Sequence, residues 1–274
     1  MYIVRDVYNC KSMKNSELLK RFMSYLEKAE KLVVFSPHFD DAVLSMGELM
    51  FNQHTKGKKI QVYNIFTQAS DSHSALTEKL LKQAGYDNPH EYFAKRKKED
   101  MDAFSAFANI SIHSLDFVDG VWRKDQNGKP LYPLTTWNIN VHTKEKGLIE
   151  QIKKSLRAIN LDTQDFIVFA PVGRGKEHVD HIIVRDICLN LFPRIIFYSD
   201  FSYSESFPLE NEFIRKNKLI PITLTDRSFN QHKIEAIAKH KSQSYALFKD
   251  SKNPQLPPET FYVQEKLMEK AHKK

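Results

Sequence analysis

The sequence predicts an α/β protein built on a mostly parallel sheet with helices on both faces. Short apolar runs, among them residues 32–35 and 166–170, alternate with segments whose apolar residues recur at helical spacing. The runs are apolar throughout rather than at every second residue, as in strands that are buried on both faces of a sheet. Strands that alternate with helices form parallel sheets, so we expect one domain of Rossmann-like topology.

Each expected element follows from its own stretch of sequence. Apolar and β-branched runs predict strands at residues 31–35, 59–67, 111–117, 165–170, 194–198 and 219–224. Apolar residues spaced three or four apart predict helices at residues 41–53, 77–84, 92–107, 145–158, 178–191 and 226–243. Asp226 or Ser228 would cap the last helix. Residues 119–143 are rich in Gly, Pro, Asn and aromatics, which predicts a loop or lid.

The length and composition favour a single folded domain. Of the 274 residues, 41% are hydrophobic and 12% aromatic, so a packed core is expected and disorder is not. We found neither an internal repeat nor a low-complexity linker. We therefore expect one domain over residues 1–274, with its core at about residues 31–245. Residues 68–92 and 120–144 would be loop or lid insertions in that core.

The net charge of +7 raises the question of an anionic partner. The densest basic clusters, at residues 95–98 and 270–274, are typical of a solvated helix face and a chain end. The usual nucleic-acid-binding motifs are missing, so we expect no nucleic acid partner. Apolar runs fall short of membrane-spanning length, so we expect no stable membrane insertion.

Cysteine usage and the first residues bear on the compartment. The two cysteines, Cys10 and Cys188, exclude a disulfide scaffold and an all-cysteine metal site. Arg5 and Asp6 stand where a signal peptide would need its apolar stretch. The expectation is a cytoplasmic protein.

Histidines and carboxylates gather directly after two of the predicted strands. His38-Phe39-Asp40-Asp41 follows the first strand, and His178-Val179-Asp180-His181 follows the fourth. By chance, a His-x-x-His pattern is expected roughly 0.4 times in this chain and His-x-Asp-Asp roughly 0.04 times. Ligands of such sheets bind outside the carboxyl ends of the strands, which is where both groups would lie.

The residue types suit a mononuclear zinc hydrolase. Catalytic zinc takes three ligands from His and Asp or Glu and leaves one position for water. His38, Asp41 and His181 form such a set, and Asp40 would remain free as a general base. His178 would stand over the developing oxyanion or protonate a leaving amine, and Asp180 would orient a histidine from outside the ligand shell.

A plainer interpretation of the same residues is structural. Asp40 and Asp41 stand at a predicted helix start, where carboxylates stabilise the free backbone N–H groups. Histidines at another helix start are commonly solvated. The presence of a full ligand set and a base after two neighbouring strands favours the metal site.

These motifs resemble those of the PIG-L/LmbE-like family of zinc-dependent N-deacetylases. That family has a His-Pro-Asp-Asp-type box after a strand and a His-x-Asp-His box further on. The segment Ser36 to Ser45 is similar to the subgroup that reads Ser-Pro-His-x-Asp-Asp-Ala-Val-Leu-Ser. Weaker similarities continue through Arg96-x-x-Glu99, Asp119-Gly120 and the segment from Lys233 to Gln243, and the resemblance covers about residues 31–245.

The resemblance implies a Rossmann-like fold and hydrolysis of N-acetyl groups, mostly from amino sugars such as N-acetylglucosamine. By position it implies the zinc ligands His38, Asp41 and His181, the base Asp40 and the oxyanion or acid residue His178. Arg96, Asp119 and Tyr203 resemble substrate-binding positions. The sequence departs from the family pattern at Phe39, Ala42 and Ser202, none of which removes a ligand. These departures weaken the inference of a particular substrate from other members of the family.

The sequence thus predicts a hydrolase that removes an N-acetyl group from an amino sugar or sugar conjugate, with one Zn²⁺ per chain. Iron(II) or cobalt(II) would also fit two histidines and a carboxylate. An amidase acting on a larger N-acyl group remains an alternative, as does a non-catalytic glycan- or partner-binding domain. Trp122 and Trp137 would stack on a sugar or belong to a satellite core. Homo-oligomerisation is left open.

Overall fold

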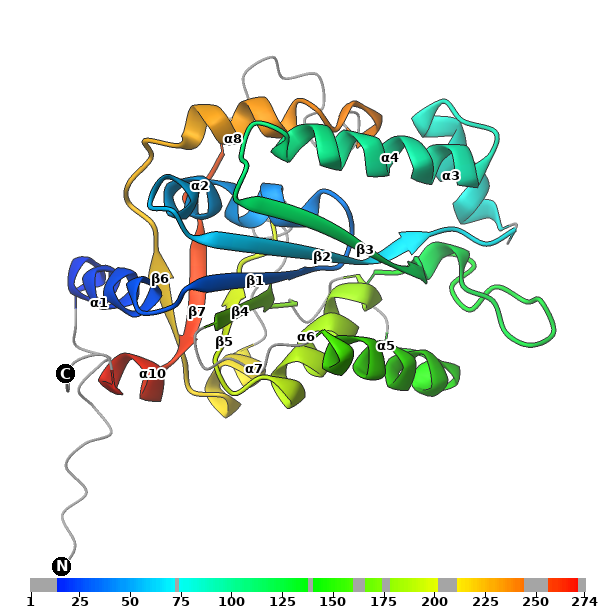
Figure 1. Cartoon of the computed structure of the whole chain (residues 1–274). Coiled ribbons are helices and arrows are strands. Elements are labelled where there is room, and N and C mark those ends of the chain that lie inside the picture. The colour runs from blue at the N-terminus through cyan, green and yellow to red at the C-terminus, as the bar shows by residue number, and fades with distance from the viewer. Residues whose placement is uncertain are drawn as a thin grey trace, which may run out of the picture.

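A single seven-stranded sheet runs through the molecule (Figure 1). The computed structural model describes residues 14–71, 74–137, 140–159, 166–173, 178–201, 211–243 and 256–270. The strand order is β3-β2-β1-β4-β5-β7-β6. The strands are β1 (Lys31–Ser36), β2 (Lys59–Gln68), β3 (Ile110–Val118), β4 (Phe166–Pro171), β5 (Ile195–Tyr198), β6 (Leu219–Thr223) and β7 (Thr260–Gln264).

The sheet is mostly parallel, as the sequence predicts. β1 pairs in parallel with β2 and β4, β2 with β3, and β4 with β5. β7 pairs antiparallel with both of its neighbours, β5 and β6. The chain leaves β1 toward β2 and β3 on one side, and later continues from β4 to β5 on the other. The switch point of this fold therefore lies between β1 and β4.

Helices cover both faces of the sheet (Figure 1). α2, α4 and α8 lie on one face, and α5, α6 and α7 lie on the other. None of the helices in the described ranges is long and apolar enough to cross a membrane. The helices are α1 (Asn15–Glu27), α2 (Asp41–Thr55), α3 (Ala75–Ala84), α4 (Pro89–Phe104), α5 (Lys146–Ala158), α6 (Val179–Leu191), α7 (Asn211–Lys216), α8 (Asn230–Ile237) and α10 (Glu265–Lys270), with 3₁₀ turns η1 (Gly120–Trp122), η2 (Thr143–Glu145) and η3 (Lys241–Gln243).

Alternate residues of the central strand belong to two separate cores. Leu32 and Val34 pack with α2, while Val33 and Phe35 pack with α5 and α6. All four side chains are fully buried. Successive side chains of a strand point to opposite faces of the sheet, and here both faces are covered. Burial on each side therefore explains the continuous apolar run.

All six predicted strands are present, but the last predicted helix is shorter than predicted. The helix predicted over residues 226–243 is only α8, and neither Asp226 nor Ser228 caps it, because its N-cap is Phe229. Asp226 accepts from the backbone N–H of Ser228 in a turn before the helix. Beyond the helix, the chain turns to bond to α4, so tertiary hydrogen bonds override helical spacing there. The helices α1, α7 and α10 and the strand β7 were not predicted.

The helix α2 is broken inside at Met46, whose φ of −145° and ψ of 24° are not helical. The break leaves backbone N–H groups without helical partners. The carboxylate of Glu259, just before β7, accepts from the backbone N–H groups of Glu48 and Leu49 at 2.8 and 3.0 Å. Lys233 of α8 pairs with the same carboxylate at 2.8 Å, and both side chains are 1% exposed. A buried ion pair thus holds the kink.

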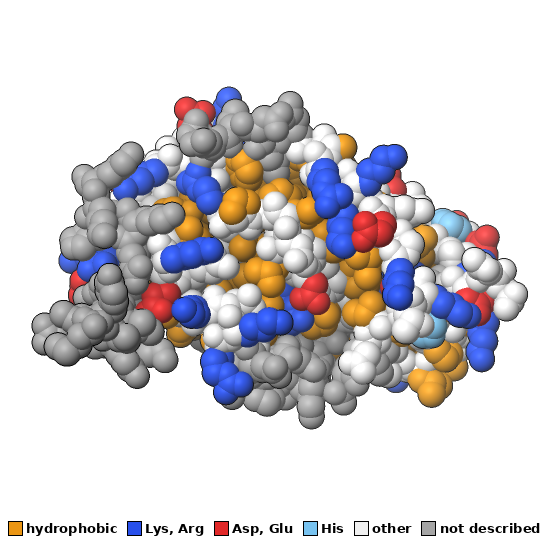
Figure 2. All heavy atoms as spheres, turned by 90° about the horizontal axis from the view of Figure 1, so that it is seen from below, with side chains coloured by type: hydrophobic (Ala, Val, Ile, Leu, Met, Phe, Trp, Pro, Cys, Tyr) orange, Lys and Arg blue, Asp and Glu red, His pale blue; other side chains and the backbone are white. Residues whose placement is uncertain are grey.

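The face seen from below shows how part of the positive charge is distributed (Figure 2). Lysine and arginine side chains are scattered over this face, between hydrophobic and uncharged polar ones. They do not gather in one stripe here, whereas a backbone-tracking nucleic-acid site would show one.

Candidate metal and active site

The two predicted motifs meet at the switch point of the sheet. His38, Asp40 and Asp41 follow β1, and His178 to His181 follow β4, which pairs directly with β1. Parallel neighbouring strands end at the same edge of a sheet, so the two loops lie against each other. The structure therefore brings together every catalytic, metal-binding and orienting residue that was predicted in the two motifs.

Two imidazoles converge on one carboxylate oxygen. His38 Nδ1 lies 3.0 Å from Asp41 Oδ2, and His181 Nε2 lies 3.3 Å from the same atom. All three residues are buried, and each offers one ligand atom within 4.8 Å of the others. This is the predicted ligand set, and it is close enough to hold one metal ion.

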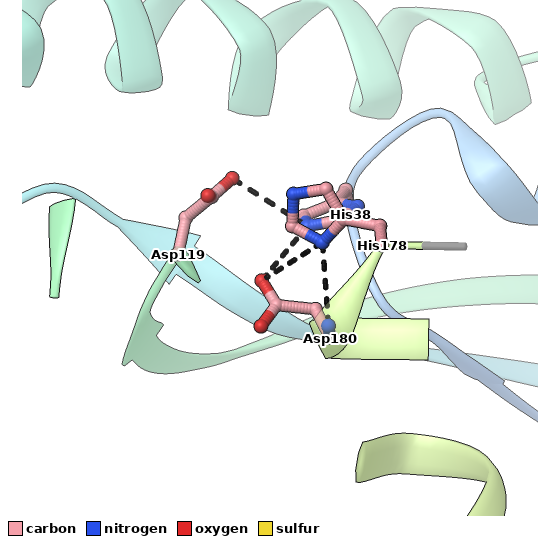
Figure 3. A group of neighbouring side chains, drawn as sticks. All are labelled: His38, Asp119, His178 and Asp180. Atoms are coloured by element: carbon pink, nitrogen blue, oxygen red, sulfur yellow. Dashed lines mark hydrogen bonds and ion pairs between the residues drawn. The ribbon is translucent and has the colours of Figure 1, made fainter. Parts of the chain in front are cut away.

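The outer nitrogen of each of these histidines is held by carboxylates. His38 Nε2 lies 3.1 Å from Asp180 Oδ2 and 3.5 Å from Asp119 Oδ2 (Figure 3). His181 Nδ1 lies 2.7 Å from Asp200 Oδ1. Metal-ligating histidines usually donate their second N–H to such a partner, which fixes the ring and raises its basicity. The arrangement would therefore support a metal ion if these histidines hold one.

The protonation of the histidines agrees with a place for a divalent cation. Burial alone lowers the pKa of His38, but the negative charge of Asp119 and hydrogen bonds to Asp180 and Asp41 raise it to about 10. Burial likewise opposes protonation of His181, yet Asp41 and Asp200 raise its pKa well above the usual value. The carboxylates thus favour positive charge at both rings, and a divalent ion there would supply positive charge. Two histidine nitrogens and a carboxylate oxygen are donors that zinc accepts.

A second grouping shares His38 with the first. His38, Asp119, His178 and Asp180 also place four ligand atoms near one another (Figure 3). Asp180 already accepts from the backbone N–H of Gly120 at 2.9 Å and forms an ion pair with the buried Arg123. A guanidinium on the same carboxylate would repel a metal ion, so the donor chemistry favours His38, Asp41 and His181.

Asp40 is paired with a residue outside the ligand set. Its Oδ1 lies 3.3 Å from Nη2 of Arg96, and both side chains line the cavity beside the histidines. Arg96 is 7% exposed and lies among the rings of Phe39, Tyr92 and Phe93, which leaves little of it for solvent. Arg96, which was predicted to bind substrate, therefore forms an ion pair with Asp40 in this structure.

Asp119 and Tyr203 were the other predicted substrate-binding residues. Asp119 lines the cavity, but its carboxylate also lies against His38. Burial raises the pKa of Asp119 and Asp180 adds to this, while His38 opposes it. Tyr203 lies outside the described residues.

One ring nitrogen of His178 has no hydrogen-bond partner among the described residues. Its Nδ1 accepts from the backbone N–H of Asp180 at 3.3 Å, so in the neutral ring the proton is on Nε2. Burial lowers the pKa of His178 well below the usual value, and the nearby His38, His181 and Arg123 lower it further against the opposing effect of Asp180. A neutral imidazole with one N–H fits an oxyanion donor better than a proton-donating acid.

A cavity of about 190 Å³ opens over these residues. Trp122 is 2% exposed and packs edge-on against Phe93, as a satellite-core aromatic would. Trp137 is half-buried, and its ring lies edge-on to His178 at 5.5 Å between centroids. Both tryptophans nevertheless line the cavity. The other lining residues are His38, Asp40, Asp41, Leu76, Leu80, Tyr92, Arg96, Asp119, Val121, Thr136, His178 and Gln243.

Sequence reasoning missed two residues that support the site. Asp200 follows β5, so the rule about strand ends could have found it. Its carboxylate bonds both His181 and the backbone N–H of Gly173. Arg123 pairs with Asp180 and, at 2.7 Å, with Glu145. Nothing in the sequence separates this arginine from an exposed one.

Gly120 lies where a side chain would disturb the site. A Cβ there would lie 3.1 Å from Arg123 Nη2, 3.2 Å from Asp180 Oδ1 and 3.3 Å from His178 Cε1. Because these groups hold His38, we expect Gly120→Ala to weaken metal binding about tenfold or more, as measured by chelator competition. Gly147→Ala is the matched control, because a Cβ at Gly147 would meet nothing within 4 Å. Equal metal affinity in the two variants would contradict this role for Gly120.

Comparisons with known proteins found deacetylases that are similar to this chain in sequence or in fold. A 2'-N-acetylparomamine deacetylase from Niallia circulans is 23% identical, over 84% of this chain and 89% of that protein. A deacetylase of the teicoplanin biosynthesis pathway has a similar fold, with a TM-score of 0.70, 21% identity, and 85% and 96% of the two chains covered. The A40926 pseudoaglycone deacetylase matches with a TM-score of 0.66, 20% identity, and 86% and 97% covered.

A family model described as GlcNAc-PI de-N-acetylase matches residues 33–192, which is more than half of the chain. The match includes both strand-end motifs and the helices that follow them. The chain belongs to the PIG-L family of de-N-acetylases.

Proposed function

We propose that this protein is a metal-dependent hydrolase, with zinc as its metal, that removes the N-acetyl group of an amino sugar or sugar conjugate. One observation carries the proposal. His38 Nδ1 and His181 Nε2 face the same oxygen of Asp41, while a separate carboxylate, Asp40, lines the cavity beside them. Ligands and base thus have different orientations although Asp40 and Asp41 are adjacent in sequence.

The chemistry assigns each residue one task. His38, Asp41 and His181 would hold a divalent metal, which would supply polarisation of the amide carbonyl and a lowered pKa of a water molecule. Asp40 accepts the proton as water attacks the carbonyl carbon, and Arg96 holds the orientation of that carboxylate. His178 donates its Nε2–H to the developing oxyanion. Asp40, now protonated, returns the proton to the leaving amine.

The names of the relatives and the size of the cavity both support this substrate class. The relative from Niallia circulans is named for an N-acetylated amino sugar compound, and the family model for an N-acetylglucosamine conjugate. The cavity of about 190 Å³ is smaller than the pockets that bind drug-sized ligands, which begin at about 300 Å³. A small acyl group fits such a space better than a long acyl chain.

Metal content tests the proposal directly. We expect about one zinc per chain by elemental mass spectrometry of tag-free protein, and loss of that zinc in His181→Ala. His113→Ala is a matched control, because His113 lies on β3 and bonds Ser111 rather than a site residue. A chain that holds no zinc, and takes up neither zinc nor iron(II), would support the binding-domain alternative instead.

Acyl specificity separates the remaining alternatives. Acetate release from N-acetyl amino sugars, with much slower cleavage of butanoyl and octanoyl analogues, is the expected result. A preference for the longer acyl chains would replace the acetyl assignment by an amidase with a larger substrate. Tight glycan binding without any hydrolysis by the zinc-loaded chain would favour a non-catalytic domain.

A further inference from the structure

The cavity has a wall that comes from the C-terminal part of the chain. Gln243, the last residue of η3, lines the cavity together with Tyr92 and Arg96 of α4. It lies 51 residues beyond the last residue of the family match, since 243 − 192 = 51. This wall is therefore separate in sequence from the two motifs that form the candidate metal site.

Hydrogen bonds to α4 fix the position of this wall. Ser242 donates its backbone N–H to Glu99 at 3.2 Å and its hydroxyl at 2.7 Å. Glu99 is 2% exposed and Ser242 is 8% exposed, so both bonds are shielded from water. Bonds of this kind to a buried carboxylate are stronger than those between neutral groups. η3 is therefore held in one place against α4, and Gln243 with it.

The side-chain amide of Gln243 is oriented by its donors. Nε2 donates to the hydroxyl oxygen of Tyr92 and to the backbone oxygen of Ser242 at 3.3 Å. A carboxamide nitrogen has two N–H donors, and both are used. Oε1 has no partner within the part of the chain that the structure describes. Gln243 therefore presents a fixed, free hydrogen-bond acceptor on the wall of the cavity.

We propose that Gln243 is a substrate-recognition residue that accepts a hydrogen bond from a hydroxyl or amide N–H of the substrate. The inference rests on the proposed function, because it takes the occupant of the cavity to be an N-acyl amino sugar. Gln243 Oε1 is the unpaired acceptor of this wall among the described residues, because the Tyr92 oxygen accepts from Gln243 and Arg96 carries donors only. A substrate that lacks the matching donor would leave Oε1 unpaired and bind less well.

The test compares Gln243→Met with wild type on methyl N-acetyl-glucosaminide and its 3-, 4- and 6-deoxy analogues. Methionine keeps the length of the side chain and removes its polar atoms. We expect KM for the parent sugar to rise about three- to tenfold, with kcat within about twofold. If one deoxy analogue is cleaved equally by both proteins, the donor is that hydroxyl. If KM rises equally for all four sugars, the donor is the acetamido N–H.

Ser242→Ala serves as the matched control for docking of η3. It removes the hydroxyl bond to Glu99 without touching the cavity, so it should lower the thermal midpoint and leave the ranking of the four sugars as in wild type. If the wild type is active and Gln243→Met has the same KM, the assignment of Gln243 is overturned while the proposed function stands. The same holds if Gln243→Met loses only kcat and thermal stability. A zinc-loaded wild type that releases no acetate from any sugar overturns the proposed function and this assignment with it.

Discussion

Replacing Asp40 with asparagine should leave the metal in place and slow acetate release by about 10²–10⁴-fold, the usual contribution of a general base. The amide is the same size as the carboxylate and can still accept from Arg96, which lies 3.3 Å from Oδ1. It can no longer take a proton from water. Because Asp40 is not part of the group of clustered ligand atoms, zinc content should stay near one per chain. The measurement pairs kcat with elemental mass spectrometry of the same sample.

The neighbouring Asp41→Asn is the matched control for this variant. It removes a charge from the adjacent residue, whose Oδ2 both histidines face, so it should lose zinc as well as activity. The two substitutions are chemically identical, and only the direction of the side chain differs. An Asp40→Asn enzyme with nearly the wild-type rate would assign the base to another group.

The second large effect is on stability. Lys233→Met should lower the free energy of unfolding by about 3–5 kcal/mol, because it leaves Glu259 buried without its cation. Glu48 lies close by, and its pKa is already raised by burial and by the charge of Glu259, so the loss of Lys233 would leave Arg227 as the cation that faces these two carboxylates. Methionine retains the apolar stem that packs against Gly47. Urea unfolding followed by far-UV circular dichroism measures the change.

The double variant Lys233→Met, Glu259→Gln separates the charge from the packing. It removes both charges, and the single oxygen of the amide can still accept from one of the two backbone N–H groups at the kink of α2. We expect it to recover part of the lost stability. A single Lys233→Met variant within about 0.5 kcal/mol of wild type would show that the pair does not hold the kink.

The sequence predicted the central fold well because the buried strands carry the signal themselves. The runs that became β1 and β4 are apolar at every position, and a parallel sheet requires that pattern. β7 was missed because it is a short antiparallel strand placed far from its partners in sequence. The end of α8 was mispredicted for a similar reason, since the bonds that turn the chain toward α4 join residues 143 positions apart.

The candidate site was predictable where its chemistry is local. His38 to Asp41 and His178 to His181 are compact motifs at strand ends, so residue type and position were enough to predict them. The groups that hold them are not local. Arg123 reaches Asp180 across 57 residues, and its partner can be recognised only in space. The same limit applies to the bond between Arg96 and Asp40, which joins residues 56 positions apart and was not predicted.

The cavity combines a floor and walls of different origin. The floor lies on β1 and β4, while the walls come from α3, the segment after β3 and η3, three stretches far apart in the chain. The segment after β3 also supports the floor, because Asp119 lies against His38 and Gly120 donates to Asp180. The walls from α3 and η3 carry none of the residues proposed as ligands or base. Under the proposed function, exchanging either of these two walls would alter which sugar conjugate enters while the hydrolytic chemistry is inherited unchanged. In evolutionary terms, such a fold would separate the reaction from the choice of substrate.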